Sequence, residues 1–306
     1  MSKPIVTLAT CADFPNLDED DRGLPQALYE RGIEPRIAVW NDLGVDWSKA
    51  GVVVMRSVRD YARKRNYANF LRWARSLERP LNHAEIVDWF GDKHYLKDLA
   101  ARGVPIIPTT WLEPSANLSK HQVHTRFPAH GDFVIKPAIS SGGRGTGRYT
   151  ATSATSRSAA INDTMHHLAR GRTVMMQRYL ESVDQTGELS LVYFNGVLSH
   201  AVQKKPMLHP RFKAVDEVHE EIVEAREPSE MEWLWGERVR RALHAQIKER
   251  AGRDIQVLFN RVDVVSDGAG GFYLMEVSLV DAPLYLNAAE GALENFADAI
   301  AQRVFW

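Results

Sequence analysis

A lysine and a glycine-rich loop stand together in the segment Phe133–Gly147, whose sequence is FVIKPAISSGGRGTG. Its apolar start is typical of a buried strand, which Pro137 would end because proline cannot donate a hydrogen bond to a neighbouring strand. Glycine lets the backbone approach a ligand closely, so that successive N–H groups can point at one anion, and Lys136 adds a positive charge beside them. The segment therefore indicates a flap over nucleotide phosphates, although an ordinary flexible surface loop could have the same composition. It is not a Walker A loop, because the chain contains no G-x-x-x-x-G-K-S/T string.

Two carboxylates form a second group of chemical interest. Asp263 and Glu276 lie inside the apolar runs RVDVV and LMEVS, which are joined by the turn-rich SDGAGG. Strand alternation places Arg261 beside Asp263 and Ser278 beside Glu276, and a hairpin centred near Gly268 would turn all four to one side. Two buried carboxylates are costly unless they are paired or bound to a metal. The pattern therefore favours either a Mg²⁺ site or a buried ion pair with Arg261.

Together these groups suit phosphoryl transfer, which mainly needs positioning and charge neutralisation from the protein. Lys93 and Lys136 could bind phosphate oxygens, while Lys204 and Arg261 could stabilise a transferring phosphoryl group. The sequence has no His/Cys cluster with zinc spacing and no G-x-S-x-G elbow, which disfavours a zinc enzyme and a serine hydrolase.

The composition narrows the class of protein further. A chain of 306 residues predicts two or three subdomains, and the net charge of −1 favours neither a nucleic-acid partner nor an anionic membrane. The single cysteine, Cys11, excludes an intrachain disulfide and fits a reducing cytosol. Since no apolar run approaches the length of a membrane span, we expect a soluble cytoplasmic protein.

The N-terminal part alternates strands and helices. Strands are predicted at 4–10, 35–40 and 51–55, with a helix at 23–31, and this order implies a parallel sheet covered by helices. No G-x-G-x-x-G follows the first strand, so a dinucleotide is not indicated.

Ligands of such sheets bind beyond the carboxyl ends of the strands. The residues at that position are Cys11, Asp13, Arg56 and Ser57. We therefore take these four as candidate substrate residues, Arg56 foremost; the alternative for each is a solvated loop residue.

The C-terminal part contains hairpin signals and a long helix. Asn195-Gly196 is the preferred pair for a two-residue type I′ turn between ELSLVYF and VLSHAVQK. A regular hairpin would put Glu188 beside Gln203, on the face opposite to Leu189, Leu191, Tyr193, Leu198, His200 and Val202. Earlier in the chain, Asp92 is a plausible N-cap for a helix at 93–102. Residues 206–229 resemble a mobile segment, and 230–250 an amphipathic helix.

The order of these pieces resembles the ATP-grasp superfamily. The family's entry segment is similar to NHAEIVDWFGDKHYLKDLAARGVPIIPTTW, and its second-lysine strand and flap are similar to FVIKPAISSGGRGTG. Its adenine-holding strand is similar to VMMQRYLES, and its magnesium strands are similar to RVDVV…YLMEVS. The match covers about residues 80–306. The N-terminal motifs LATCADFPNLDEDD and RSVRDY resemble a smaller group of standalone amino-acid-type ligases, which includes the D-cycloserine-forming ligase.

The resemblance implies roles for individual residues. Phosphate and flap contacts would come from Lys93, Lys136, Ser141, Gly142 and Gly143. Adenine would be framed by Gln177, Tyr179 and Leu180, with Asp184 or Glu188 near the ribose.

For the reaction itself, the resemblance implies that Asp263 and Glu276 bind Mg²⁺ while Lys204 and Arg261 face the γ-phosphate. The family's usual E-x-N ends here in Ser278, a weaker oxygen ligand, which puts the third metal ligand in doubt.

The resemblance also implies an α/β fold with α+β character in its C-terminal part. A Rossmann-like parallel-sheet domain at 1–91 would precede two α+β subdomains, at 92–176 and 177–306, that clasp ATP. The expected activity is an ATP-dependent carbon–nitrogen ligase for a small amino-acid-like substrate, acting through an acyl-phosphate-like intermediate to give a linear amide or a ring. The alternatives are an ATP-binding regulatory protein without catalysis and the addition of amino acids to a protein tail. Ligases of this size commonly pair, so a homodimer is one expected state.

Overall fold

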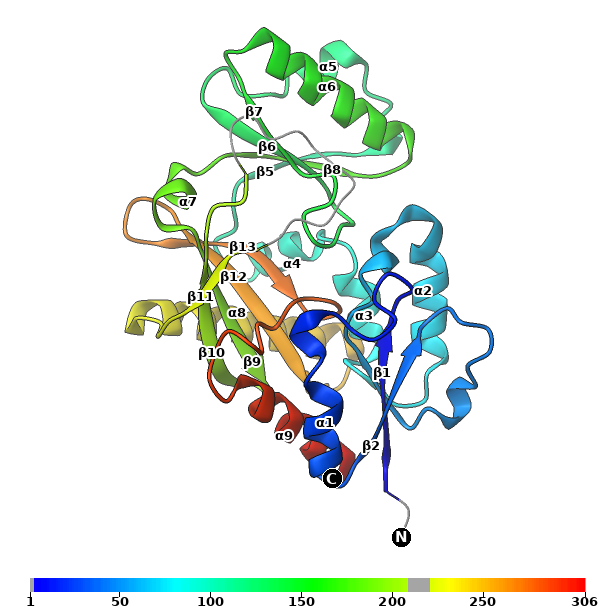
Figure 1. The fold of residues 1–306 in the computed structure, drawn as a ribbon. Coiled ribbons are helices and arrows are strands. Elements are labelled where there is room, and N and C mark those ends of the chain that lie inside the picture. The colour runs from blue at the N-terminus through cyan, green and yellow to red at the C-terminus, as the bar shows by residue number, and fades with distance from the viewer. Residues whose placement is uncertain (1–2, 209–220, 306) are drawn as a thin grey trace.

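The computed structural model describes residues 3–208 and 221–305 and folds them around three sheets (Figure 1). The first sheet is parallel with strand order β2-β1-β3-β4. Its strands are β1 (Ile5–Thr10), β2 (Glu34–Val39), β3 (Val52–Met55) and β4 (Pro80–Leu81). This arrangement confirms the Rossmann-like parallel sheet predicted for the N-terminal part.

Helices on both sides of the parallel sheet bury its apolar strands. These helices are α1 (Leu24–Glu30), α2 (Lys64–Ser76) and α3 (Ala84–Phe90), with short 3₁₀ turns at Glu19–Asp21, Trp47–Lys49 and Arg59–Ala62. The C-terminal helix α9 (Ala292–Phe305) returns to pack against α1, so both ends of the chain share one hydrophobic core (Figure 1).

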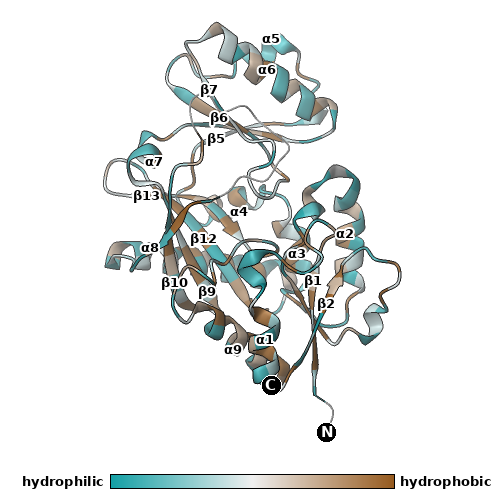
Figure 2. Ribbon diagram, in the orientation of Figure 1, coloured by the Kyte–Doolittle hydropathy of each residue, from teal (hydrophilic) through white to brown (hydrophobic). Residues whose placement is uncertain are grey.

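The second sheet forms an upper lobe, in antiparallel order β5-β8-β6-β7. It contains β5 (Thr109–Leu112), β6 (Asp132–Pro137), β7 (Gly147–Thr150), β8 (Val174–Arg178), a 3₁₀ turn at Pro114–Ala116, α5 (Lys120–His124) and α6 (Ala154–Ala169). Figure 2 shows polar and apolar residues alternating along α6, which packs against the sheet over a separate core. Because β8 continues to Arg178, the subdomain boundary expected at 176/177 falls inside a strand.

The third sheet is antiparallel, in order β11-β10-β9-β12-β13, and lies below the upper lobe in Figure 1. It contains β9 (Glu188–Phe194), β10 (Val197–Lys204), β11 (Val223–Ala225), β12 (Phe259–Ser266) and β13 (Phe272–Ser278), with α4 (Tyr95–Ala101), α7 (Glu181–Thr186) and α8 (Glu230–Ala251) beside it. The predicted long helix is confirmed as α8, which buries Val239, Leu243 and Ile247. Of the segment expected to be mobile, residues 209–220 lie outside the described residues, and the strand β11 follows them.

A bulge in β10 makes part of the predicted hairpin register wrong. The Asn195-Gly196 turn forms, but the pairing shifts by one residue between Leu198 and His200. Gln203 therefore pairs with Leu189, and Lys204 with Glu188. A one-residue slip turns every following side chain to the other face. The consequence is that Lys204, not Gln203, lies beside Glu188.

Two buried side chains, one from the N-terminal part and one from α4, attach these segments to the third sheet. The Asn82 amide donates to Phe259 O (2.9 Å) and Leu279 O (2.8 Å), and its Oδ1 accepts from Leu258 N (2.7 Å). The Tyr95 hydroxyl donates to Val277 O (2.8 Å) and accepts from Val277 N (2.9 Å). Since each of these buried polar groups has its partners, the end of β13 is held firmly against α4.

None of the helices in the described residues is long and apolar enough to cross a membrane.

Candidate active site

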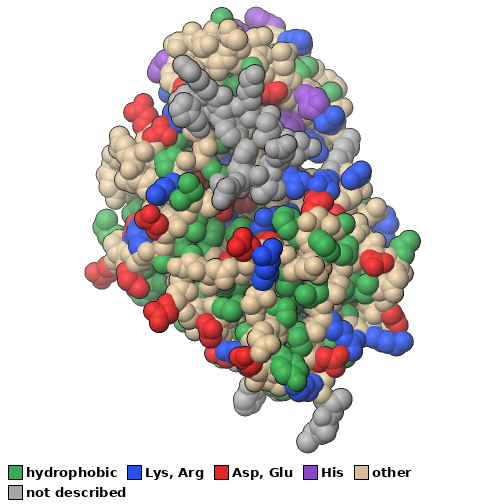
Figure 3. Space-filling view, in the orientation of Figure 1, with side chains coloured by type: hydrophobic (Ala, Val, Ile, Leu, Met, Phe, Trp, Pro, Cys, Tyr) green, Lys and Arg blue, Asp and Glu red, His purple; other side chains and the backbone are tan. Residues whose placement is uncertain are grey.

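A cavity of ≈ 630 Å³ lies where the upper lobe, the third sheet and the N-terminal part meet. Figure 3 shows Lys and Arg side chains near this junction. Fourteen of the candidate residues line it: Lys93, Lys136, Ser141, Gly142, Gly143, Gln177, Tyr179, Leu180, Glu188, Lys204, Arg261, Asp263, Glu276 and Ser278. The structure therefore brings together residues that are up to 185 positions apart in the sequence, from 93 to 278.

Two lysines enter the cavity from opposite elements. Lys136 is the last residue but one of β6 and is buried, and this burial lowers the pKa of its ammonium group to about 8. The Lys93 Nζ donates to Ser140 O (3.0 Å) and Ser140 Oγ (3.1 Å) and lies 3.3 Å from Glu276 Oε1. Both lysines thus stand beside the flap that the glycine-rich segment forms.

The predicted helix at 93–102 begins two residues late, at Tyr95, and this frees Lys93. Asp92 is not its N-cap; the Asp92 carboxylate instead accepts from His94 N (3.1 Å) and contacts His94 Nδ1 (2.6 Å). The Lys93 backbone N–H donates to Ala138 O (3.1 Å), just after β6. As a result, Lys93 reaches the flap from the helix entry instead of from its first turn.

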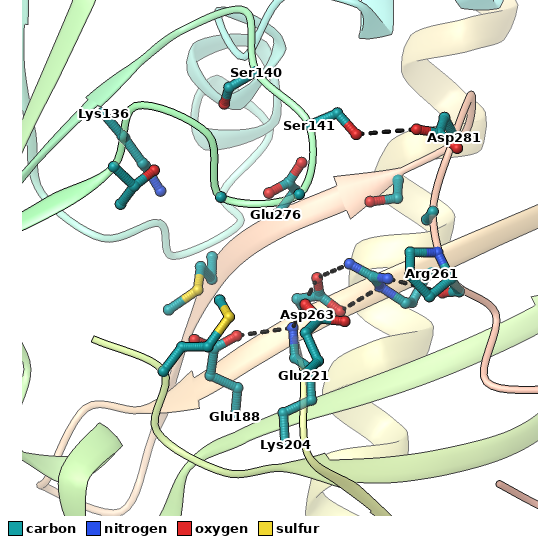
Figure 4. A pocket seen from close by; sticks show the side chains of 18 of the residues that line it. Lys136, Ser140, Ser141, Glu188, Lys204, Glu221, Arg261, Asp263, Glu276 and Asp281 are labelled. Atoms are coloured by element: carbon teal, nitrogen blue, oxygen red, sulfur yellow. Dashed lines mark hydrogen bonds and ion pairs between the residues drawn. The ribbon is translucent and has the colours of Figure 1, made fainter. Parts of the chain in front are cut away.

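The flap itself uses glycine where other residues would be strained. Gly142, Gly143 and Gly145 have φ values of 62°, 71° and 71°, in the left-handed region that side-chain-bearing residues avoid. Ser141 Oγ donates to Asp281 Oδ2 (3.0 Å), on the loop after β13. This contact crosses the cavity from the upper lobe to the third sheet, as Figure 4 shows.

The paired strands β12 and β13 present their polar side chains to the cavity as predicted. Asp263 is opposite Glu276 and Arg261 is opposite Ser278 in the strand register. Asp263 also makes the ion pair that the sequence left open: Arg261 Nε donates to its Oδ1 (2.9 Å), and Arg261 Nη2 to its Oδ2 (2.7 Å). Although burial alone would raise it, Arg261 and Lys204 lower the pKa of Asp263 to about 2.

The donor set at this point fits Mg²⁺ in part. Two carboxylates that are directly opposite on adjacent strands can reach one cation, and Mg²⁺ typically takes one or two carboxylates together with substrate phosphates. In the part of the chain that the structure describes, no three His, Cys, Asp or Glu side chains are grouped to hold a metal by themselves. Asp263 and Glu276 would therefore hold Mg²⁺ together with phosphate oxygens, and Asp263 would share its oxygens between the ion and Arg261.

Lys204 lies at the centre of a buried charge cluster below the cavity. Its Nζ is 2.9 Å from Glu188 Oε2, 3.4 Å from Asp263 Oδ2 and 4.0 Å from Glu221 Oε1 (Figure 4). Burial favours the neutral amine, but the surrounding carboxylates raise the pKa of Lys204 well above its usual range. Lys204 is therefore a fixed positive charge at the cavity floor.

The residues proposed to surround the nucleotide base lie near the end of β8. The Gln177 amide donates to Thr109 Oγ1 (2.7 Å), and the Tyr179 hydroxyl donates to Asp184 Oδ1 (2.5 Å). Arg148 lies over the Tyr179 ring, 3.5 Å from its centroid, and its Nη1 is 2.9 Å from Asp184 Oδ2. Because Asp184 is held by these two groups, it does not line the cavity, unlike the other candidates for the nucleotide.

The four candidate substrate residues do not line the cavity either. Cys11 is fully buried in the core, and Asp13 pairs with Arg63 (2.6 Å). The parallel-sheet rule locates the correct edge of the sheet, but it does not tell which side chains turn inward after each strand.

Arg56 and Ser57 point into a buried network behind the cavity. Arg56 Nε donates to Asp21 Oδ1 (2.9 Å), and Ser57 Oγ donates to Asp21 Oδ2 (3.2 Å). Arg56 Nη2 also donates to Ala282 O (3.0 Å). These contacts make Arg56 a positioning residue for the loop after β13.

Several residues that line the cavity are not among the site residues predicted from the sequence. They are Phe14, Asp18, Glu19, Asp20, Arg59, Tyr61 and Asp281. Two features of the sequence could have indicated them: the acidic run LDEDD after the first strand, and the aspartate just beyond LMEVS.

The N-terminal sheet is parallel, and two further sheets enclose lysines, a glycine flap and an acidic strand pair. This arrangement is typical of the ATP-grasp class. The fold is similar to that of D-alanine–D-alanine ligase from Bacillus anthracis complexed with ATP, with a TM-score of 0.64 and 15% identity over 98% of each chain. It is also similar to a RimK domain protein ATP-grasp from Sphaerobacter thermophilus, with a TM-score of 0.61 and 18% identity over 98% of this chain and 100% of the other. The predicted ATP-grasp architecture is thus confirmed.

More specific matches come from one group within this class. Residues 6–85 match the family described as D-cycloserine synthetase DcsG, N-terminal domain. The crystal structure of D-cycloserine synthetase DcsG has a TM-score of 0.85 and 31% identity over 98% of this chain and 99% of the other. The cycloserine biosynthesis protein DcsG of Streptomyces lavendulae is 32% identical over 303 residues, which are 98% of this chain and 99% of that protein. The chain belongs to the DcsG family of ATP-grasp ligases.

Proposed function

We propose that this ligase joins carbon to nitrogen within one small amino acid and closes a ring, as in D-cycloserine formation. The observation that carries the proposal is the convergence of Lys93, Lys136, Lys204 and Arg261 on one cavity. The end-to-end similarity to a protein named D-cycloserine synthetase supports ring closure over linear amide formation.

The chemistry of the ring defines the substrate class. In D-cycloserine, a nitrogen attached to the serine side-chain oxygen is acylated by the carboxyl carbon of the same serine. Opening that bond with water gives β-aminooxyalanine, which carries both reacting groups. Its carboxylate oxygen attacks the γ-phosphorus of ATP and releases ADP, and the aminooxy nitrogen then attacks the acyl carbon. The carbon–oxygen bond to phosphate breaks, and the proton lost by nitrogen leaves with the phosphate.

The cavity residues would divide this work between them. Lys93 and Lys136 would hold phosphate oxygens beneath the flap, and Arg261 and Lys204 would balance the negative charge that builds up during transfer. Mg²⁺ held by Asp263 and Glu276, with Ser278 as a weaker ligand, would neutralise the charge of the bound triphosphate. Gln177, Tyr179 and Leu180 would surround the adenine, with Glu188 nearer the ribose.

The test uses purified full-length protein with ATP, MgCl₂ and D- or L-β-aminooxyalanine. We expect ADP to appear together with one cyclic product per ADP, measured by a coupled ADP assay and mass spectrometry. ATP binding without ADP release would support the regulatory alternative instead. An amide that joins two amino acids would overturn ring closure while leaving the ligase activity intact.

The low pKa of Lys136 predicts how ATP use depends on pH. The cationic ammonium binds phosphate, and in the free enzyme it loses its proton as the pH rises through about 8. We expect kcat/KM for ATP to fall above that pH by about tenfold per pH unit. Bound phosphate stabilises the cation, so the corresponding fall in kcat should begin at a higher pH. Lys136→Arg stays charged, so an unchanged alkaline limb in that variant would contradict the assignment.

A further inference from the structure

The cavity has a second, acidic end away from its lysines. Asp18, Glu19 and Asp20 line it from the N-terminal part, and Asp281 lines it from the loop after β13. Asp18 is neutralised by an ion pair with Arg59, whose guanidinium lies 5.0 Å from the centroid of the Phe14 ring. The cavity therefore has a cationic region that suits phosphates and an acidic region that suits a positively charged group.

Most of the acidic side chains at this end already have a structural task. Asp20 Oδ2 accepts from Leu284 N (2.8 Å) and Tyr285 N (2.9 Å), which fixes the loop after β13. Asp281 differs: it is half-buried, whereas Glu19 is exposed, and the hydrogen bond to its carboxylate within the described residues is the one from Ser141 Oγ. A carboxylate can accept about four hydrogen bonds, so Asp281 keeps most of its capacity for a ligand.

The charge on Asp281 is also poorly balanced. Burial raises the pKa of its carboxyl group to about 6, and Arg59 and Arg56 oppose that shift only through space. Asp281 is half-buried, and a carboxylate that is partly removed from water gains from binding a cation. No group of three metal-ligating side chains is found here among the described residues, so an ammonium ion fits better than a metal.

The loop that carries Asp281 also reaches Arg261, because Arg261 Nη1 donates to Pro283 O (2.8 Å). In Figure 4, Asp281 and Arg261 lie on the same side of the cavity, and Lys136 lies on the other. An α-amino acid carries its ammonium and carboxylate groups on one carbon. A molecule whose ammonium binds Asp281 would therefore have its carboxylate on the side of the cavity where Arg261 lies (Figure 4).

We propose that Asp281 binds the α-ammonium group of the substrate and so selects α-amino acids over acids that lack the amine. This inference rests on the proposed function and names the specificity-determining residue of that site. Ser141 belongs to the flap and donates to the same carboxylate, which connects substrate binding to the position of the flap over ATP.

The test compares two ligands that differ only in the amine: β-aminooxyalanine and 3-aminooxypropionate. Their dissociation constants are measured by calorimetry on full-length protein with a non-hydrolysable ATP analogue and Mg²⁺. The wild type should bind the amino acid more tightly by about 10- to 100-fold, the size of one charge-assisted hydrogen bond. In Asp281→Asn this ratio should fall to about 1 to 3, because the amide cannot balance the ammonium charge.

Glu19→Gln is the matched control, since Glu19 lines the same end of the cavity. The ratio of the two dissociation constants in that variant should equal the wild-type ratio. If the ratio falls in Glu19→Gln as well, the selectivity comes from the combined negative charge at this end of the cavity and not from Asp281. Equal binding of the two ligands by the wild type, or an undiminished ratio in Asp281→Asn at an unchanged melting temperature, would overturn the inference. The ratio of dissociation constants is measured without turnover, so it is independent of whether the protein releases ADP. If the wild type binds β-aminooxyalanine selectively but forms no ADP, the proposed function fails and the Asp281 assignment stands.

Discussion

Replacing Lys136 with methionine should lower kcat/KM for ATP by about 10³-fold and leave the protein folded. Lys136 is only 9% exposed, so a phosphate that reaches it has lost much of its hydration and depends on the ammonium charge. Methionine fills a similar volume but supplies no charge. The loss should appear both in ATP affinity, measured by calorimetry, and in steady-state ADP release.

The stability of this variant should move in the opposite direction. The folded-state pKa of Lys136 is about 8, below its ordinary value of 10.5, so the folded state disfavours the charged form. This cost is present at neutral pH and disappears once the pH exceeds the ordinary value, where the group is neutral in both states. Methionine removes the cost, so Lys136→Met should melt at or above the wild-type temperature at pH 7.

A surface lysine provides the control for Lys136→Met. Lys205 follows Lys204, is exposed, and pairs with Glu224 on the edge strand β11 (3.3 Å). Lys205→Met should change kcat/KM for ATP by less than about twofold, because Lys205 does not line the cavity. Its exposed ion pair also contributes little to the stability of the fold. Wild-type ATP use by Lys136→Met would contradict the role given to this lysine.

The parts of the site that sequence could locate are those with a fixed local geometry. The glycine flap was predictable because only glycine suits the φ values of Gly142 and Gly143. The convergence of Asp263 and Glu276 followed from strand alternation across a turn-rich hairpin, and their register is direct. Lys93 was proposed as a phosphate ligand from its residue type, and its position in the structure depends on contacts with the flap rather than on its own helix.

The parts that sequence could not locate depend on events at single residues. The bulge after Leu198 leaves no strong composition signal, yet it decides that Lys204 and not Gln203 lies beside Glu188. In the same way, the parallel-sheet rule led to Arg56, whereas the cavity is lined by Arg59, one short turn further on. A candidate can therefore be near the right edge of a sheet and still point behind the site.

Asp263→Asn should cost the protein both activity and about 3–5 kcal/mol of unfolding free energy. Its carboxylate accepts from Arg261 through two nitrogens and from Ser190 Oγ (2.6 Å), and Lys204 Nζ lies 3.4 Å away. An amide would leave the buried guanidinium without a countercharge and would place an N–H₂ against donors. Urea unfolding followed by circular dichroism measures the loss, and ADP release measures the activity.

The pH dependence of that stability difference follows from the pKa of Asp263. Its folded-state pKa of about 2 lies below the ordinary value of 3.8, so the ionised carboxylate stabilises the folded state above pH 3.8. This contribution decreases as the pH falls toward 2, where the carboxyl group becomes protonated in both states. The gap in unfolding free energy between the wild type and Asp263→Asn should therefore narrow between pH 4 and pH 2.

Glu276→Gln separates the metal role of the acidic pair from its structural role. The Glu276 side chain is 32% exposed, and its ion pair in the described structure is a contact of 3.3 Å with Lys93. Removing its charge should therefore lower stability by less than about 1 kcal/mol, yet it should reduce ADP release as strongly as Asp263→Asn and raise the Mg²⁺ concentration needed for half-maximal rate. If Glu276→Gln loses as much unfolding free energy as Asp263→Asn, the loss is not specific to the carboxylate that pairs with Arg261. The ion pair would then not explain the structural importance of Asp263. If Asp263→Asn keeps wild-type stability, Arg261 must find another partner when the carboxylate is removed, and the conflict between ion pairing and metal binding at Asp263 disappears.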